Sequence, residues 1–323
     1  MVTFRSGSDV QVRVRAKLNL YFAVLGKLGD GFHEIETLMA PIDLSDELLF
    51  QLEPSGLVTV VCDWATVNVR GSNALLGELP TASGNLAARA VLLLKQRAGV
   101  AHGAHIRLIK RIPAASGLGG GSADAAAALV AANIGWELNW SQERLAKVAG
   151  ELGSDVPFFL HSAWAVCRGR GEQIEPVDRL GVWHAVVVRP PEGLSTAEVY
   201  GHCQPGEARP SVDPLLKALR RGDARGMRRF MTNGLQPAAE RLSPWIGRVI
   251  RELRRVGCTA AQMSGSGSSC FGICHTGRHA RRVAAQTKAR NVGRVFVVQI
   301  GATTRSRPGF PTRQDAFPSG WKA

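Results

Sequence analysis

The sequence predicts a mixed α+β fold with two domains. The chain has 323 residues, which at about 150 residues per domain corresponds to about two domains. Hydrophobic residues make up 45% of the chain and charged residues 20%, a balance that excludes a largely disordered or fibrous protein. Segments with the alternation of a strand and segments with the period of a helix are mixed from the start, and this mixture predicts the fold class.

The first clear element is a strand at residues 10–20, VQVRVRAKLNL. Apolar side chains at every second position would lie on one face, and polar side chains, Lys17 and Asn19 among them, on the other. We therefore expect a half-buried strand. Residues 85–99 have helical periodicity and end at a glycine, a common helix stop. Further strands are predicted at residues 48–52, 57–61, 105–109, 184–190 and 295–300.

The chain is strongly basic, with 40 Lys and Arg against 26 Asp and Glu and a net charge of +14. Residues 209–255 alone hold 12 Lys or Arg against 4 Asp or Glu, which is over half of the excess. These charges stand among leucine, valine and isoleucine at helical spacing, so we interpret them as the solvated faces of amphipathic helices. A nucleic-acid surface is the less favoured alternative, because aromatic side chains for base stacking are sparse there.

Neither a membrane anchor nor an export signal is visible. No stretch reaches the roughly 18 uninterrupted apolar residues that span a bilayer, and the N-terminus lacks the apolar core of a secretory signal. We therefore expect a cytoplasmic protein. Six dispersed cysteines without a CxxC pair favour reduced thiols over structural zinc or disulfides. Residues 306–323 mix Pro, Gly and charge without a period, which predicts a disordered tail.

The strongest motif is IPAASGLGGGSADAAAAL at residues 112–129. Its glycines stand directly before an alanine-rich helix that we expect to open near Ser122. Glycine lets the backbone adopt a positive φ and approach a ligand, and the first turn of a helix offers unpaired N–H groups. Together these features predict a phosphate cradle. Ser122 can add a hydrogen bond or hold a magnesium ion; the alternative is a plain turn with Ser122 as helix cap.

Two common phosphate loops fit this segment poorly. A Walker A loop requires a lysine that is missing here, and a Rossmann fingerprint requires Gly or Ala where Ser122 stands and follows the first strand. The segment instead resembles the ATP loop of the GHMP kinase superfamily, Pro-x-x-x-Gly-Leu-Gly-Ser/Gly-Ser/Gly-Ser. The matching positions are Pro113, Gly117, Leu118, Gly119, Gly120, Gly121 and Ser122.

A second segment, ELGSDVPFFL at residues 151–160, places Asp155 in a turn between a glycine and a proline. Phosphoryl transfer to an alcohol requires an acceptor for the hydroxyl proton and cations that stabilise charge on the transferred group. Asp155 can be the acceptor, and Lys17 one of the cations. Each residue alone has a plain alternative, a turn or capping aspartate and a solvated lysine.

Two further blocks extend the resemblance. RAKLNLYF from Arg15, with DGFH after it, is similar to the N-terminal block of one branch of the superfamily, and MSGSGSSCFG at residues 263–272 is similar to its third motif. The blocks occur in family order over most of residues 15–300. The resemblance implies a ribosomal-protein-S5-like, ATP-binding domain at residues 1–165 and a ferredoxin-like domain at residues 166–305, with the active site between them.

The resemblance also implies roles for single residues. Lys17 and Asp155 would be the catalytic pair, with Asn19 near the phosphates or the metal. His33 would read the edge of a cytosine base, while Phe32 and Tyr200 would stack on its two faces. The plain alternatives are a surface histidine, a core aromatic and a helix-face tyrosine. Further contacts are implied for Lys110 and Asn85 beside the adenine, and for Gly265 and Gly267 beside the substrate.

The implied reaction is transfer of the γ-phosphoryl group of ATP, with Mg²⁺, to the 2-hydroxyl of 4-diphosphocytidyl-2-C-methyl-D-erythritol, in the non-mevalonate isoprenoid precursor pathway. The alternative is another GHMP kinase, for homoserine, mevalonate or a sugar, which should lack the aromatic–histidine pair at residues 32 and 33. A nucleic-acid-binding protein is a weaker alternative. We expect no nucleic-acid or membrane partner, and either a monomer or a homodimer. Residues 63–83 do not align and can reshape the nucleotide pocket.

Overall fold

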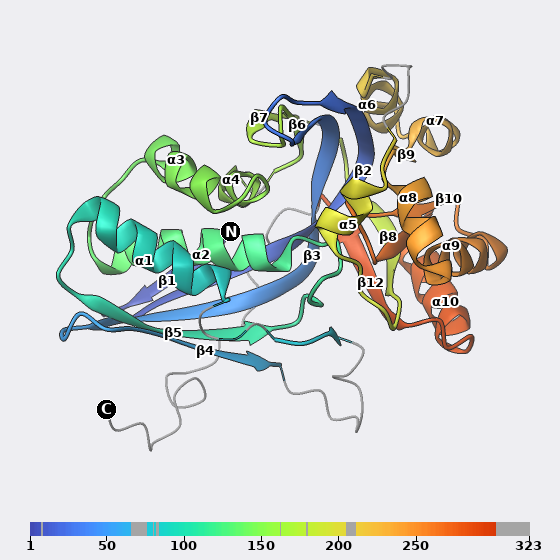
Figure 1. Cartoon of the computed structure of the whole chain (residues 1–323). Helices are drawn as coiled ribbons and strands as arrows, with labels where there is room; N and C mark the ends of the chain where they lie inside the picture. Colours follow the sequence, from blue (N-terminus) through green and yellow to red (C-terminus); the bar gives the residue numbers. More distant parts are fainter. Residues whose placement is uncertain are drawn as a thin grey trace.

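The computed structural model describes residues 1–301 apart from residues 8, 66–75, 80, 82–83, 162, 179 and 205–210. The tail predicted at residues 306–323 and much of the unaligned stretch 63–83 therefore lie outside the described residues. The described chain forms two lobes that lie side by side and are joined by long strands (Figure 1). The predicted two-domain α+β fold class is confirmed.

The strands are β1 (Val2–Ser6), β2 (Asp9–Lys27), β3 (His33–Glu53), β4 (Val58–Trp64), β5 (Gly103–Lys110), β6 (Ala165–Arg168), β7 (Gln173–Pro176), β8 (Trp183–Arg189), β9 (Thr232–Asn233), β10 (Ala260–Met263), β11 (Cys270–Cys274) and β12 (Arg294–Ile300). The helices are α1 (Leu86–Ala98), α2 (Gly120–Gly135), α3 (Gln142–Leu152), α4 (Val156–His161), α5 (Thr196–Gly201), α6 (Asp213–Arg220), α7 (Ala224–Phe230), α8 (Gln236–Leu242), α9 (Pro244–Arg255) and α10 (Gly277–Lys288).

The N-terminal lobe is a sheet with helices on one face (Figure 1). Its strands run in the order β1-β2-β3-β5-β4, antiparallel except for the parallel pair β5 and β4. Helix α2 packs against β2, β3 and α1. Because its alanine-rich sequence is apolar on nearly every side, α2 is buried on nearly every side. This central helix carries the phosphate-loop motif at its N-terminus.

The C-terminal lobe has the β-α-β-β-α-β arrangement of a ferredoxin-like domain. Its antiparallel sheet has the order β12-β8-β11-β10, and helices α9 and α10 pack against it. The sheet joins the N-terminal lobe where Ile300 of β12 pairs with Ile42 of β3. Among the described residues, no helix combines the length and the apolar character needed to cross a membrane.

Most predicted elements appear close to their expected bounds. Helix α1 ends at Gly99, which has a left-handed φ of 66° and caps the helix. The basic stretch forms α6, α7, α8 and α9, and arginines such as Arg225 and Arg251 are exposed on them. The prediction of a half-buried strand at residues 10–20 is correct only for the first part of that strand. From Lys17 to Val24 both faces of β2 are buried, because the C-terminal lobe covers the polar face.

Candidate active site

Irregular pairing in β2 delivers Lys17 and Asn19 to the junction of the lobes. The register between β2 and β3 shifts between Arg15 and Lys17, and again between Asn19 and Tyr21. Such bulges change the direction of neighbouring side chains and are common beside active sites. The result is a lysine and an asparagine that are only 3% and 0% exposed. The backbone N–H of Lys17 also donates to the carbonyl of Leu118 at 3.0 Å, which ties β2 to the phosphate loop.

Lys17 and Asp155 lie together, as the sequence predicts. The Nζ atom of Lys17 is 3.3 Å from Oδ2 of Asp155 and donates to Oδ1 of Asn19 at 2.6 Å. The amide of Asn19 donates in turn to Oγ1 of Thr37 at 2.8 Å, and Thr37 donates to the carbonyl of Tyr21 at 2.6 Å. This chain of hydrogen bonds fixes which side of the asparagine faces the lysine. A buried cation is thus held in one position by a carboxylate and an amide oxygen.

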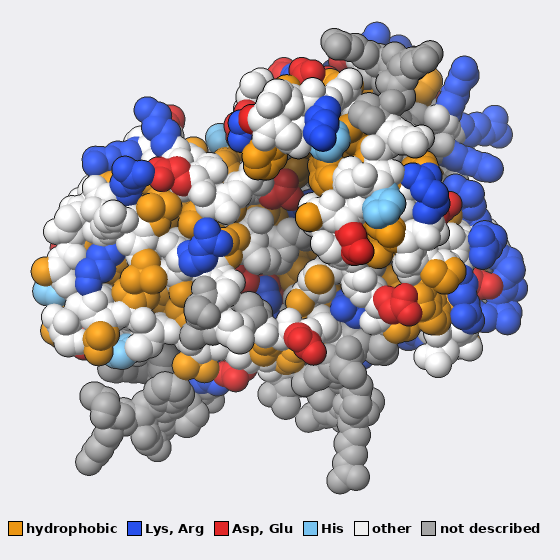
Figure 2. Space-filling view, in the orientation of Figure 1, with side chains coloured by type: hydrophobic (Ala, Val, Ile, Leu, Met, Phe, Trp, Pro, Cys, Tyr) orange, Lys and Arg blue, Asp and Glu red, His pale blue; other side chains and the backbone are white. Residues whose placement is uncertain are grey.

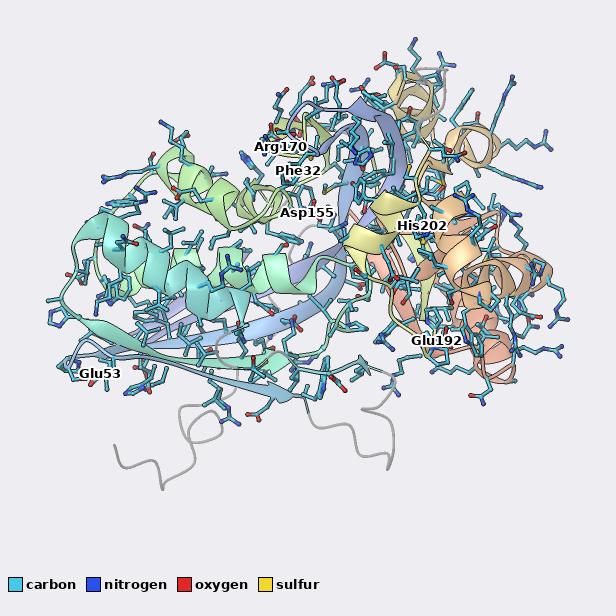
Figure 3. The ribbon with its side chains drawn as sticks, in the orientation of Figure 1. Phe32, Glu53, Asp155, Arg170, Glu192 and His202 are labelled. Atoms are coloured by element: carbon cyan, nitrogen blue, oxygen red, sulfur yellow. The ribbon has the colours of Figure 1, made fainter. Side chains whose placement is uncertain are left out.

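Asp155 differs from Lys17 in its access to solvent. Its side chain is 34% exposed, whereas that of Lys17 is 4% exposed. The residue follows the end of α3 and directly precedes α4, so its backbone is fixed between two helices. Figure 2 shows a cleft between the two lobes, and Figure 3 places Asp155 beside it, on the side opposite α5. A substrate hydroxyl in the cleft can therefore reach the carboxylate.

The helix that follows the phosphate loop begins earlier in the sequence than predicted. Helix α2 starts at Gly120 rather than near Ser122, and Gly119 is its cap residue with a φ of 73°. Ser122 is therefore the third residue of the helix and not its cap. A Cβ atom on Gly119 would lie 2.6 Å from Cζ of Phe159, so only glycine fits. The first N–H groups of α2 lack carbonyl partners within the helix and are available to an anion.

The second glycine turn packs directly against the phosphate loop. The hydroxyl of Ser264 donates to the carbonyl of Gly117 at 3.0 Å, and the N–H of Ser269 donates to the carbonyl of Ser116 at 3.0 Å. A Cβ atom on Gly117 would lie 2.2 Å from the carbonyl oxygen of Ser264, and one on Gly265 would lie 3.2 Å from Nζ of Lys17. The two turns and β2 therefore meet at one point. Gly267 lies in the same turn, with a φ of 88°.

Two residues that hold this junction, Ser264 inside the second glycine motif and Asn233 outside any motif, were not predicted as site residues. Ser264 accepts from the N–H of Asn19 at 3.3 Å. Asn233 donates to the carbonyls of Met263 and Gly265 at 2.9 and 2.8 Å. Ser264 could have been suggested by its place in the motif at residues 263–272, whereas no sequence signal points to Asn233, because its partners lie some 30 residues further along the chain.

The two residues predicted beside the adenine already have partners within the protein. Nζ of Lys110 is paired with the carboxylates of Asp46 and Asp124, all three residues being buried. Burial alone would lower the pKa of Lys110, but the two carboxylates raise it. Asn85 caps α1 by accepting from the N–H of Ala87 at 2.9 Å. A contact of either residue with a nucleotide stays a prediction.

The predicted base-binding residues divide into two groups. The rings of His33 and Tyr200 lie 5.1 Å apart between centroids with an interplanar angle of 35°. Burial, and then the charge of Lys27, lower the pKa of His33, which favours the neutral form of its ring. Phe32 is 53% exposed and lies under the guanidinium of Arg170, 4.4 Å from ring centroid to Cζ. Figure 3 shows Phe32 and Arg170 together above Asp155.

Comparison with known proteins supports the same interpretation. Residues 85–163 match the family described as "GHMP kinases N terminal domain", and residues 215–292 match "GHMP kinases C terminal". A protein of Pelotomaculum thermopropionicum named 4-diphosphocytidyl-2-C-methyl-D-erythritol kinase is 41% identical over 277 residues, which cover 84% of this chain and 91% of that protein. One of the same name from Thermobifida fusca is 40% identical over 287 residues, or 87% and 92% of the two chains.

A solved structure agrees with these relatives. The crystal structure of a 4-(cytidine 5'-diphospho)-2C-methyl-D-erythritol kinase superposes with a TM-score of 0.73 at 35% identity, covering 91% of this chain and 100% of that one. The fold, the glycine loop and these matches define a small-molecule kinase. The chain belongs to the GHMP kinase family, and the relatives that it matches over most of its length share the name 4-diphosphocytidyl-2-C-methyl-D-erythritol kinase.

Proposed function

We propose that the protein transfers the γ-phosphoryl group of ATP to the 2-hydroxyl of 4-diphosphocytidyl-2-C-methyl-D-erythritol. The reaction type rests on one observation, the convergence of Lys17, Asp155 and the glycine loop at the same cleft. The substrate is that of the relatives at 40% and 41% identity. The pairing of His33 with Tyr200 beside the cleft supports a planar base at that end of the substrate.

We assign a task to each group on the basis of this geometry. The N–H groups at the start of α2 would bind the phosphates of ATP, because the helix dipole and the glycine backbone favour negative charge there. Asp155 would accept the proton of the attacking hydroxyl as the new oxygen–phosphorus bond forms and the bond to ADP breaks. Lys17 would stabilise negative charge on the transferred group, and Asn19 holds Lys17 in place for this.

The site fits Mg²⁺ that is bound mainly through the nucleotide. Mg²⁺ usually retains waters and takes one or two protein oxygens beside substrate phosphates. Among the described residues, no group of three His, Cys, Asp or Glu side chains is placed to hold a metal. The hydroxyl of Ser122, in the first turn of α2, would be the protein ligand. When bound, the ion would neutralise charge on the phosphates.

The base end of the substrate would lie near α5. We propose that a cytosine stacks on Tyr200, with His33 reading its edge through a neutral ring that both donates and accepts. Phe32 would close over the other face, because its ring is exposed and backed by Arg170. Gly265 and Gly267 would let the backbone of the second turn approach the substrate.

Other expectations stay predictions. The division between residues 165 and 166 falls inside β6, which pairs with β3 and so continues the N-terminal sheet. A cytoplasmic location, the choice between monomer and homodimer, and the lack of a nucleic-acid partner are likewise untested.

A direct assay tests the proposed function. Purified protein would be incubated with ATP, Mg²⁺ and each of three acceptors: the cytidylylated methylerythritol, homoserine and mevalonate. We expect ADP release only with the first, and phosphorus NMR should show a new phosphate monoester on the 2-oxygen. Turnover of homoserine or mevalonate instead would retain the kinase and overturn the substrate. An absence of turnover with any of them would direct the search to other alcohols, such as sugars.

A further inference from the structure

A cavity of about 510 Å³ lies in the C-terminal lobe, between α7, β9, α8, the end of α9 and β10. None of the predicted site residues lines it. Its volume is within the roughly 300–1,000 Å³ of pockets that bind small molecules. The cavity is therefore a possible binding site that is separate from the catalytic cleft.

The charge at this cavity is positive. Arg228 of α7 and Arg254 of α9 line it, and no Asp or Glu belongs to its described lining. An NH2 atom of Arg254 donates to the carbonyl of Ala261 at 3.4 Å, which keeps this side chain at the cavity. Figure 2 shows Lys and Arg side chains gathered along the same outer side of the lobe, over α7, α9 and α10. Two guanidinium groups at one small cavity match a phosphate or diphosphate group.

The floor of the cavity is polar and already ordered. Asn233 and Gln262 line it, and both are buried. Gln262 donates to the carbonyls of Asn19 and Leu20 at 3.0 and 3.1 Å, so its side chain is held by strand β2. Met231 and Pro237 add apolar lining. The amide N–H groups of Asn233 and Gln262 are taken by backbone carbonyls, so a phosphate would be bound by the two arginines, beside a fixed wall.

We propose that this cavity is a second ligand site, for a small phosphorylated molecule whose phosphate groups lie between Arg228 and Arg254. The site shares a wall with the catalytic cleft, because Asn233 and Gln262 hold the backbone of Gly265 and Asn19 from the cavity side. It does not depend on the proposed substrate of the kinase.

Calorimetric titration with inorganic pyrophosphate tests the site on the full chain. The phosphate loop can also take pyrophosphate, so the comparison must separate the two sites. We expect the double variant R228Q/R254Q to lose at least about tenfold in affinity at one site, since each charged pair that is lost weakens binding. The matched control R225Q/R251Q removes the same charge from exposed positions of the same two helices and should bind as the wild type does.

A loop variant completes the test. In Gly119→Val, which obstructs the phosphate loop, pyrophosphate should still bind to the cavity, and R228Q/R254Q added to it should remove that binding. Wild-type affinity and stoichiometry in R228Q/R254Q would overturn the proposal. Equal losses in R225Q/R251Q would also overturn it, because a diffuse positive field and no defined site would then explain the binding. Circular dichroism and thermal unfolding establish that each variant is folded.

Discussion

Asp155 and Lys17 share one ion pair but differ in exposure, and this difference assigns their chemistry. The buried lysine cannot move away from the site, while the partly exposed carboxylate faces the cleft. We therefore expect Asp155→Asn to lower kcat by a factor on the order of 100 to 10,000, the range for loss of a general base. ATP affinity should change little, because Asn keeps the shape of the side chain while losing its charge and its ability to accept a proton.

Steady-state kinetics and calorimetry with a non-hydrolysable ATP analogue measure these two quantities. Glu53→Gln is the matched control, since Glu53 lies at the far end of the N-terminal lobe (Figure 3) and should leave both unchanged. A variant of Asp155 that retained more than half of the wild-type kcat would remove this residue from the mechanism.

Tyr200 carries the prediction about the base. Loss of one stacking partner costs roughly 1–3 kcal/mol, which corresponds to about 5- to 150-fold in affinity. Tyr200→Leu should raise the KM for the cytidylylated substrate by about this factor and leave the KM for ATP nearly unchanged. His33→Ala should also raise the KM for the cytidylylated substrate, because the polar edge of the base would lose its hydrogen-bond partner.

Tyr200→Phe is the control for Tyr200→Leu, because it keeps the ring and should bind the substrate almost as the wild type does. Both KM values would be measured with each substrate varied in turn. If the KM for ATP rose instead, the aromatic group would line the adenine pocket and the cytidine assignment would fail. If neither value moved, the kinase would stand without an assigned substrate.

Single site residues could be predicted from the sequence where they belong to a recognisable local motif. Lys17, Asp155 and the loop glycines were found in this way, and the structure brings them together. The role of Ser264 was not predicted although it lies in the motif at residues 263–272, and Asn233 was missed altogether, because both act through hydrogen bonds to segments far away in the sequence. Nothing in a local window distinguishes such a serine or asparagine from one on the surface.

At the scale of elements, the N-terminus of α2 depends on a glycine that packing requires. In Gly119→Val, the new side chain would meet the ring of Phe159 and the stem of Lys17, at a positive φ that β-branched residues resist. We expect ATP binding to be lost in a variant that still folds. Titration with a non-hydrolysable ATP analogue measures the binding, and thermal unfolding reports the fold.

Gly150→Ala is the matched control, because this glycine lies within α3 and a Cβ atom there would meet nothing within 4 Å. Alanine in an exposed helix should stabilise the protein by about 0.5–1 kcal/mol and leave ATP affinity unchanged. Unchanged affinity in a folded Gly119→Val would mean that the loop is only structural.

Elements were predictable where one face is exposed. Strand β5 and helices α1 and α9 have clear periods because solvent covers one side of each. The first half of β3 was missed. From Thr37 to Ile42 every residue of this strand is buried, so hydrophobicity does not alternate there. The proline at position 41 also argued against a strand, because proline lacks the N–H that a sheet requires. In the structure the pairing with β2 is irregular at this proline.

At the scale of the whole molecule, the two lobes are not independent bodies. Strands β2 and β3 supply the N-terminal sheet and also contact the C-terminal lobe, and the second glycine turn is bonded to the phosphate loop. The active site is thus complete only when both lobes are folded. Lys17 comes from near the N-terminus, while the turn that packs against it comes from residues 263–272.

Ser264 couples the lobes through two hydrogen bonds of one side chain, and it gives the last prediction. Its hydroxyl, which is fully buried, bonds both the carbonyl of Gly117 and the N–H of Asn19. Ser264→Ala would leave both groups buried without this partner, so the free energy of unfolding should fall by about 1–3 kcal/mol. The KM for ATP should rise as well, because the loop loses its support.

Ser269→Ala makes the same change in the same turn, but its hydroxyl has no hydrogen-bond partner among the described residues, so its cost should be small. Denaturant unfolding measures both variants, and equal stabilities would show that Ser264 does not couple the lobes.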